Sequence, residues 1–347
     1  MQTPIDIRII NPTSWRGWDK QVASLHEATP FHSAAWAKVL SETYGFEPSY
    51  YTGWQNGKLA IVIPMMKVAS RLTGRRYVSL PFSDWCDPIC ESGIDINPVI
   101  ERILADARSN GCKYVEWRCR QELFWNEPVW STFFGHRLAL AGGEAKVFSS
   151  FCSSTRRNIR KAEKEKVQIR WGDDLGSMRE FYRLHCRTRR EHSLPPQPFS
   201  FFRNIWEYVI RPKHGLIILA SHLGKDIAAS LSLHFSRHAS YKFGASDSRY
   251  QELRANNLVM WEAIKWYCRE SYKDFDFGRT DMTNEGLRRY KLGWGAEESP
   301  ICYYRYDTKQ DRFIVGSQSG PPVCRFIRKM PIFLLRRIGE LSYRHFA

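Results

Sequence analysis

The sequence predicts an α/β protein of two units, each with a mixed sheet flanked by helices. The chain has 347 residues, roughly twice the usual length of a single domain. Hydrophobic residues make up 43% of it, so each half can bury a core. Segments with apolar residues at helical spacing alternate with short apolar runs that are typical of buried strands. This alternation favours sheets covered by helices over an all-helical or all-strand fold.

The first unit is expected to cover residues 1–150, with residues 307–347 returning to complete it. It opens with a helix at 31–43, where Phe31, Ala35 and Val39 recur at helical spacing. The further elements expected in this unit are strands at 59–65, 76–80 and 114–118, a loop at 81–88 and a helix at 98–109.

The second unit is expected to cover residues 151–306. Ser153 and Ser154 are predicted to cap a strongly basic helix at 155–166, and Asn256 and Asn257 a helix at 258–270. The other helices are expected at 175–190, 200–209 and 285–291. Strands are expected at 216–221, 228–235, 240–245, 274–279 and 301–306, with a turn at 223–226 between the first two.

Charge and cysteine content indicate partners and a compartment. Lys and Arg number 52 against 36 Asp and Glu, a formal net charge of +16, which favours polyanionic partners such as nucleic acid, phosphorylated precursors or an anionic membrane face. Nine scattered cysteines fit reduced thiols better than a disulfide framework or a zinc site. Since the chain shows neither a signal peptide nor a run of about 18 apolar residues, we expect a cytoplasmic protein without a membrane-spanning helix.

Several longer motifs resemble the FemABX family, the peptidoglycan bridge-forming aminoacyltransferases built from tandem GNAT-like acyltransferase domains. The resemblance covers residues 31–306 and is densest in the second unit. Its motifs are Phe31-His32-Ser33-Ala34-Ala35-Trp36, Leu80-Pro81-Phe82-Ser83-Asp84, Thr155-Arg156-Arg157-Asn158-Ile159-Arg160-Lys161-Ala162, residues 188–198, residues 241–246, Asp276-Phe277-Gly278-Arg279-Thr280, and Gly286-Leu287-Arg288-Arg289-Tyr290-Lys291-Leu292-Gly293-Trp294-Gly295.

Two departures from the family leave the acyl donor open. The helical-hairpin insertion that some members carry, and that is linked to tRNA, is absent. Residues 249–257 contain no glycine, whereas a GNAT pyrophosphate loop uses glycines to bring its backbone onto the phosphates. The co-substrate is therefore either aminoacyl-tRNA or acyl-CoA, with no permanently bound cofactor and no metal.

The resemblance implies a catalytic role for Lys291, whose ammonium would stabilise the oxyanion formed when an amine attacks the donor carbonyl. Its neighbours Tyr290 and Trp294 either line the acceptor channel or pack on the sheet. Asp84 is a candidate acceptor of the amine proton, or a cap of its own loop. His192 is a candidate general base, or an ordinary surface histidine.

Further candidates are substrate-binding residues. Lys38 and Arg190 correspond to family positions associated with precursor phosphates, and a guanidinium suits bidentate phosphate contacts. Arg279 and Asp281 follow a predicted strand, where they contact a phosphate or carboxylate, or pair with each other.

Two basic segments are candidates for a polyanion or membrane patch. The helix at 155–166 contributes Arg156, Arg157, Arg160 and Lys161. Residues 324–347 form a basic amphipathic segment with Arg328, Arg336 and Arg337, which either lies on an anionic leaflet or docks on the first unit.

These observations predict a transferase that forms an amide by moving an acyl or aminoacyl group onto a primary amine of a cell-envelope precursor, either peptidoglycan or polysaccharide. The precursor would be phosphorylated or lipid-linked, tRNA is a possible second partner, and the site of action would be the cytoplasm or the inner face of the membrane. The alternative is a non-catalytic, degenerate acyltransferase fold that binds polyanions or membranes.

Overall fold

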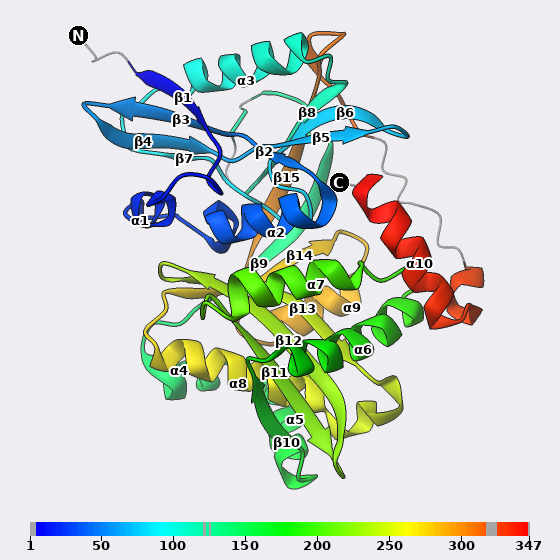
Figure 1. Cartoon of the computed structure of the whole chain (residues 1–347). Coiled ribbons are helices and arrows are strands. Elements are labelled where there is room, and N and C mark those ends of the chain that lie inside the picture. Colours follow the sequence, from blue (N-terminus) through cyan, green and yellow to red (C-terminus); the bar gives the residue numbers. More distant parts are fainter. Residues whose placement is uncertain (1–4, 121–122, 125, 317–324, 346–347) are drawn as a thin grey trace. The chain divides into compact units, whose positions relative to one another are not determined.

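The computed structural model describes residues 5–120, 123–124, 126–316 and 325–345, and the chain divides into two compact units. Residues 1–135, 299–319 and 344–347 form the first unit, and residues 136–298 and 320–343 the second. The predicted boundary near residue 150 thus lies at residue 135. Figure 1 labels the helices and strands of both units.

The first unit contains two sheets and three α-helices. One sheet has the order β1-β3-β4-β7, and in the other β15, β8, β6, β5 and β2 are successive neighbours. The strands are β1 (Asp6–Ile10), β2 (Glu47–Pro48), β3 (Tyr50–Gln55), β4 (Lys58–Ile63), β5 (Met66–Ser70), β6 (Gly74–Val78), β7 (Ile89–Cys90), β8 (Tyr114–Cys119), β15 (Glu297–Asp307) and β16 (Arg312–Phe313). The helices are α1 (Trp18–Ala23), α2 (Ala34–Tyr44) and α3 (Asn97–Ser109), with a 3-10 turn η1 (Pro30–His32) before α2.

The second unit has one sheet, in the order β10-β11-β12-β13-β14-β9. Its strands are β9 (Ser131–Ala139), β10 (Gln168–Gly172), β11 (Gly215–His222), β12 (Lys225–Phe235), β13 (His238–Ser246) and β14 (Asp274–Asp281). Its helices are α4 (Gly143–Ser150), α5 (Ser153–Lys164), α6 (Leu175–Glu191), α7 (Phe199–Ile205), η2 (Trp206–Ile210), η3 (Ser248–Leu253), α8 (Ala255–Arg269), α9 (Glu285–Leu292), η4 (Arg325–Lys329) and α10 (Ile332–Ser342), and the 3-10 turn η5 (Tyr343–His345) follows α10.

Alternation along β11 places helices on both faces of this sheet. Ile218 and Ala220 are buried in one core with residues of α5 and α8. Ile217 and Leu219 are equally buried and point to the other face, because successive side chains of a strand alternate. Helix α6 packs against β11, β12 and β13 on that second face. The strands are buried on both sides, which explains their continuous apolar sequences.

The pairing of β13 with β14 positions the candidate site. These strands are parallel, and their register runs from His238 opposite Asp274 to Ser240 opposite Asp276. Both strands continue for several residues beyond the last pair. Two parallel strands that stop pairing while they continue leave an opening between them.

Both predicted caps are wrong in detail. Helix α5 begins at Ser153, so its cap position is Cys152, and no side chain there accepts a capping hydrogen bond. Helix α8 begins at Ala255, which places Asn256 and Asn257 inside its first turn rather than before it. The turn expected at 223–226 is confirmed. Leu223 and Gly224 have the positive φ angles of a two-residue hairpin turn.

The C-terminal segment differs from the sequence expectation. Residues 320–343 group with the second unit instead of completing the first. The reason is that α10 packs on α6, where Leu335 is fully buried. The eight described cysteines are free thiols, in agreement with the sequence.

Candidate active site

The second unit contains a cavity of about 480 Å³ beside the part of β13 that follows its last pair with β14. Residues of β13 form one wall, the start of α8 another, and α9 a third. The lining residues are Asn158, Thr188, His192, Ile227, Ala228, Tyr241, Gly244, Ala245, Ser246, Asp247, Tyr250, Gln251, Arg254, Ala255, Asn256, Asn257, Leu287 and Tyr290.

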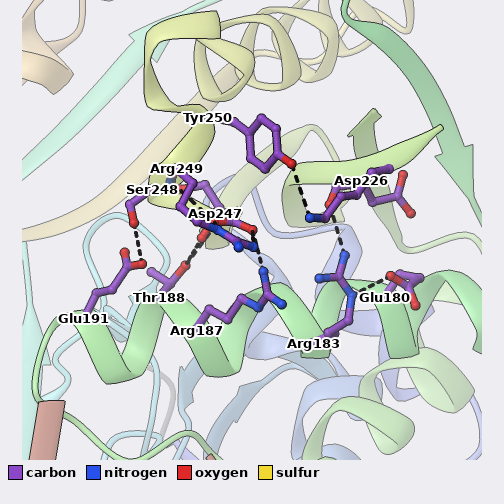
Figure 2. Close-up of polar contacts among 12 residues, drawn as sticks. Glu180, Arg183, Arg187, Thr188, Glu191, Asp226, Asp247, Ser248, Arg249 and Tyr250 are labelled. Carbon is purple, nitrogen blue, oxygen red and sulfur yellow. Dashed lines mark hydrogen bonds and ion pairs between the residues drawn. The ribbon is translucent and has the colours of Figure 1, made fainter. Parts of the chain in front are cut away.

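Hydrogen bonds between α6 and the end of β13 fix one rim of the cavity (Figure 2). The hydroxyl of Thr188 donates to the carbonyl of Ser246 over 3.1 Å and accepts from the amide of Ser246 over 2.9 Å. Glu191 accepts a hydrogen bond of 2.7 Å from Ser248. This rim is therefore rigidly attached to the last turns of α6.

Asp247 is the charged centre of the same rim. Its buried carboxylate accepts two hydrogen bonds from Arg249, of 2.9 and 2.6 Å, and pairs with Arg187 of α6. The Arg249 hydrogen bonds, assisted by the charge of Arg187, hold the pKa of Asp247 well below its usual range. The loop between β13 and α8 is thus tied to α6 by an ionised carboxylate.

The start of α8 gives the cavity an anion-binding character. Arg254 precedes the helix in the left-handed conformation, with φ 57°, and contributes no side-chain cap. An N-terminus without a side-chain cap leaves backbone N–H groups and the positive end of the helix dipole available to a negatively charged group. Residues 254–257 all line the cavity. Arg254 therefore occupies a position of positive φ, where glycine is usual. The 3-10 turn η3 lies before α8, where a GNAT domain would have its glycine-containing loop.

Lys291 is buried and held by the backbone of β14. Its ammonium donates hydrogen bonds to the carbonyls of Gly278, over 2.8 Å, and Arg279, over 2.9 Å. Gly278 has φ 72°, a conformation that other residues rarely adopt inside a strand, and its amide donates to Asp276 over 2.6 Å. Lys291 is not among the lining residues, although its neighbour Tyr290 is.

A polar cluster that was not predicted from the sequence lies near this lysine. His136 of β9 has no exposed surface, and its Nε2 lies 3.2 Å from a carboxylate oxygen of Glu298. Arg288 of α9 donates two hydrogen bonds of 2.8 Å to the same carboxylate. Burial lowers the pKa of His136, and the nearby charge of Lys291 lowers it further, so the imidazole is neutral at pH 7.

Arg288, Lys291 and Glu298 lie within eleven residues of the chain, whereas His136 lies more than 150 positions earlier. None of the strands expected from the sequence includes His136, which lies in β9. The one available signal was the charge of Arg288 and Glu298 on either side of the glycine turn.

The aromatic residues beside Lys291 have different roles. Tyr290 lines the cavity, and burial raises its pKa to about 12, so its hydroxyl stays protonated. Trp294 is fully buried, with its ring centroid 5.0 Å from that of Phe151 in the core. Trp294 therefore packs in the core, as one alternative expected, and Tyr290 lines the cavity.

The remaining candidates of this unit are only partly brought together. His192 lines the cavity from the end of α6, whereas Arg190 is half-buried on the same helix and does not line it. Arg279 and Asp281 are both exposed at the end of β14. Neither is among the lining residues of the cavity.

Lys38 and Asp84 belong to the first unit. Lys38 is half-buried on α2, and Asp84 lies in the loop 81–88, where its backbone carbonyl accepts a hydrogen bond of 2.7 Å from Tyr303. In the same loop, the carboxylate of the buried Asp87 accepts a hydrogen bond of 2.6 Å from the backbone amide of Arg120.

The basic candidates lie at the surface. On α5, Arg157, Arg160 and Lys161 are exposed, while Arg156 is half-buried and donates to the carbonyl of Ser149 over 2.8 Å. Arg328 of η4 and Arg336 and Arg337 of α10 are exposed. Within the described residues, no group of three or more His, Cys, Asp or Glu is arranged to hold a metal ion, and no helix is long and apolar enough to cross a membrane.

Comparison with known proteins bears on both the cavity and the fold. Residues 149–292 match the family model described as an acetyltransferase (GNAT) domain. FemX has a similar structure, with a TM-score of 0.66 and 13% identity over 86% of this chain and 96% of that one. A tandem GNAT protein from the clavulanic acid biosynthesis pathway has a TM-score of 0.56 and 8% identity over 88% of this chain and 99% of that one. The fold is that of the tandem GNAT proteins.

This tandem GNAT fold confirms the fold class expected from the sequence and, at the level of fold, the resemblance to the FemABX family. L-PGS from Bacillus licheniformis is also similar, with a TM-score of 0.52 and 14% identity over 88% of this chain and 92% of that one. No curated protein matches the sequence. The matched GNAT domain contains the cavity, α9 and Lys291.

Proposed function

We propose that this tandem GNAT protein is an N-acyltransferase that moves an acyl or aminoacyl group from an activated donor to a primary amine of a cell-envelope precursor. The donor is an aminoacyl-tRNA or an acyl-CoA, and the acceptor is a phosphorylated or lipid-linked precursor of peptidoglycan or polysaccharide. The likeness to FemX and to L-PGS supports the envelope acceptor. We place the reaction in the cytoplasm, at the inner face of the membrane.

The observation that carries this proposal is the cavity along the end of β13, with the start of α8 at its wall. Both donors carry phosphates and an activated carbonyl. The N-terminus of α8 together with Arg254 suits the phosphates, and the part of the cavity along β13 suits an extended acyl-bearing arm. The carbonyl would then lie near α9 and Tyr290.

The chemistry requires the amine nitrogen to attack the donor carbonyl, forming a C–N bond and breaking the C–O bond of an ester or the C–S bond of a thioester. The donor already supplies the driving force, so the protein mainly orients the amine and stabilises the oxyanion. We assign Lys291 to this centre as a fixed positive charge held by the Gly278 and Arg279 carbonyls. His192 lines the cavity and is the candidate acceptor of the amine proton.

The test is a donor assay. Purified protein is mixed with acyl-CoA thioesters or with total charged tRNA, together with an amine-bearing muropeptide precursor, and the amide product is read by mass spectrometry. Product with either donor supports the proposal and identifies the co-substrate. Tyr290→Ala and His192→Ala should lower turnover, whereas Arg289→Ala, an exposed change on α9 outside the cavity, should not.

The second candidate function is a non-catalytic module that binds polyanions or membranes. The observation in its favour is that Lys291 directs two of its N–H groups to backbone carbonyls. No product with either donor, combined with loss of polyanion binding when Arg157 and Arg160 are changed to Glu, would favour this alternative.

A further inference from the structure

Helix α10 is held to the second unit through one face. Leu335 is fully buried, and Gly339 is packed so closely on the carbonyl of Pro196 that an added Cβ would lie 1.9 Å from that oxygen. After the helix, the hydroxyl of Tyr343 donates to Pro195 over 3.0 Å and accepts from Arg189 over 2.8 Å. These contacts fix the orientation of α10 on α6.

The opposite face of α10 is apolar and exposed. Phe333 is 65% exposed and Leu341 74%, and Leu334 and Ile338 are also exposed. Positions 334, 338 and 341 recur at the three- and four-residue spacing that places side chains on one helix face. Four large exposed apolar side chains thus lie on one short helix, and exposed apolar clusters mark interaction sites.

Basic side chains accompany these apolar residues. Arg328 and Lys329 lie on η4, just before the helix, and Arg336 and Arg337 lie on the helix itself, with Arg337 between Phe333 and Leu341. Glu340 is the one acidic residue of α10, and Arg337 donates to it over 3.1 Å. An apolar cluster accompanied by an excess of positive charge is complementary to the surface of an anionic membrane.

A groove of about 420 Å³ between α6 and α10 extends this basic surface. It is lined by Tyr182 and Phe199 as well as by arginines of both helices. Arg183 and Arg187 are occupied by Glu180 and Asp247, whereas Arg179 and Arg336 form no ion pair with a described residue. The Arg336 guanidinium lies 5.4 Å from the centroid of the Tyr182 ring, which holds it at the groove.

We propose that α10 docks this protein on an anionic membrane: Phe333, Leu334, Ile338 and Leu341 enter the interface, and Arg179 and Arg336 hold a lipid phosphate at the groove beside it. The helix lies in the plane of the interface, since it is too short to cross a bilayer. The docking is independent of the acyl-transfer reaction, and a failure of one would leave the other standing.

Vesicle co-sedimentation of the full chain tests this docking, with phosphatidylcholine vesicles that either contain or lack phosphatidylglycerol, at about 0.1 M salt. We expect the wild-type chain to bind the anionic vesicles. Phe333→Ser with Leu341→Ser should lower its partition coefficient about tenfold or more, because two large side chains lose their burial. Arg179→Gln with Arg336→Gln should lower it about fivefold for each charge removed.

Two matched controls make the test specific. Lys58→Gln with Lys309→Gln removes the same charge from exposed positions of the first unit, and Leu223→Ser removes an exposed leucine at a hairpin tip. Both should bind much as the wild type does. The substituted side chains in all four variants are exposed, so thermal melts should confirm that folding is unchanged.

Three results would overturn the proposal. The first is no binding of the wild-type chain to anionic vesicles. The second is a loss of binding in the Lys58→Gln with Lys309→Gln variant as large as in the α10 variants. The third is a wild-type dimer in sedimentation that Phe333→Ser with Leu341→Ser converts to monomers without affecting vesicle binding, which would make the apolar face a contact between copies of the chain.

Discussion

Replacing Lys291 by Met tests both its structural and its catalytic role. The buried ammonium donates to the carbonyls of Gly278 and Arg279 over 2.8 and 2.9 Å. Met has similar length but no N–H, so the substitution leaves two carbonyls without these donors. A buried polar group that loses its partner costs about 1 to 3 kcal/mol. The free energy of unfolding should therefore fall by about 2 to 5 kcal/mol.

The catalytic part of the prediction concerns turnover of the molecules that remain folded. If the charge of Lys291 stabilises the oxyanion, kcat should fall about 10² to 10³-fold. Urea unfolding followed by circular dichroism measures the first effect, and amide formation read by mass spectrometry, at a temperature well below the variant's Tm, measures the second.

A destabilised control separates the two effects. Tyr267→Phe removes a buried hydroxyl that donates to Ser232 over 2.8 Å, in the same unit but outside the cavity lining. It should lower stability by about 1 to 2 kcal/mol and leave turnover unchanged. Wild-type stability of the Lys291→Met variant would refute the structural role, and wild-type turnover would refute the catalytic one.

Three further predictions concern other parts of the second unit. Asp247→Asn should lower stability at pH 7 by about 1 to 3 kcal/mol. Arg249 lowers the pKa of Asp247 in the folded chain, so the stability that this carboxylate contributes is present above the unfolded pKa of about 4 and is lost as the pH falls. The free energies of unfolding of wild type and variant, measured against pH, should therefore converge in acid. A constant difference between them at all pH values would contradict this prediction. Burial lowers the pKa of His136, so its imidazole should titrate below about 6.5 in NMR spectra. As the pH falls below that value, the unfolded chain takes up a proton that the folded chain does not, and the free energy of unfolding should fall. Titration at or above 6.5 would disprove the burial argument. Gly339→Ala should release α10, because the added Cβ meets the Pro196 carbonyl, and unchanged protease resistance around residue 332 would count against this docking.

Several helices and strands could be predicted from the sequence, with bounds close to those observed. The helix expected at 285–291 is α9 at Glu285–Leu292, and the strand expected at 274–279 is β14 at Asp274–Asp281. Both follow from apolar periodicity and from glycine at the end of a helix, which act over a few residues.

Tertiary structure alone decided which side chains meet. His136 and Glu298 are 162 positions apart, and only the ordering of strands in the sheet brings them to Lys291. The docking of α10 on α6 likewise depends on Gly339 fitting against Pro196, a contact that no periodicity encodes. The sequence by itself determined the helices and strands with clear apolar periodicity, such as α9 and β14, and the basic surface, because these depend on neighbours along the chain. The cavity, the buried polar cluster and the outward face of α10 depend on contacts between distant segments, and only the folded chain specifies them.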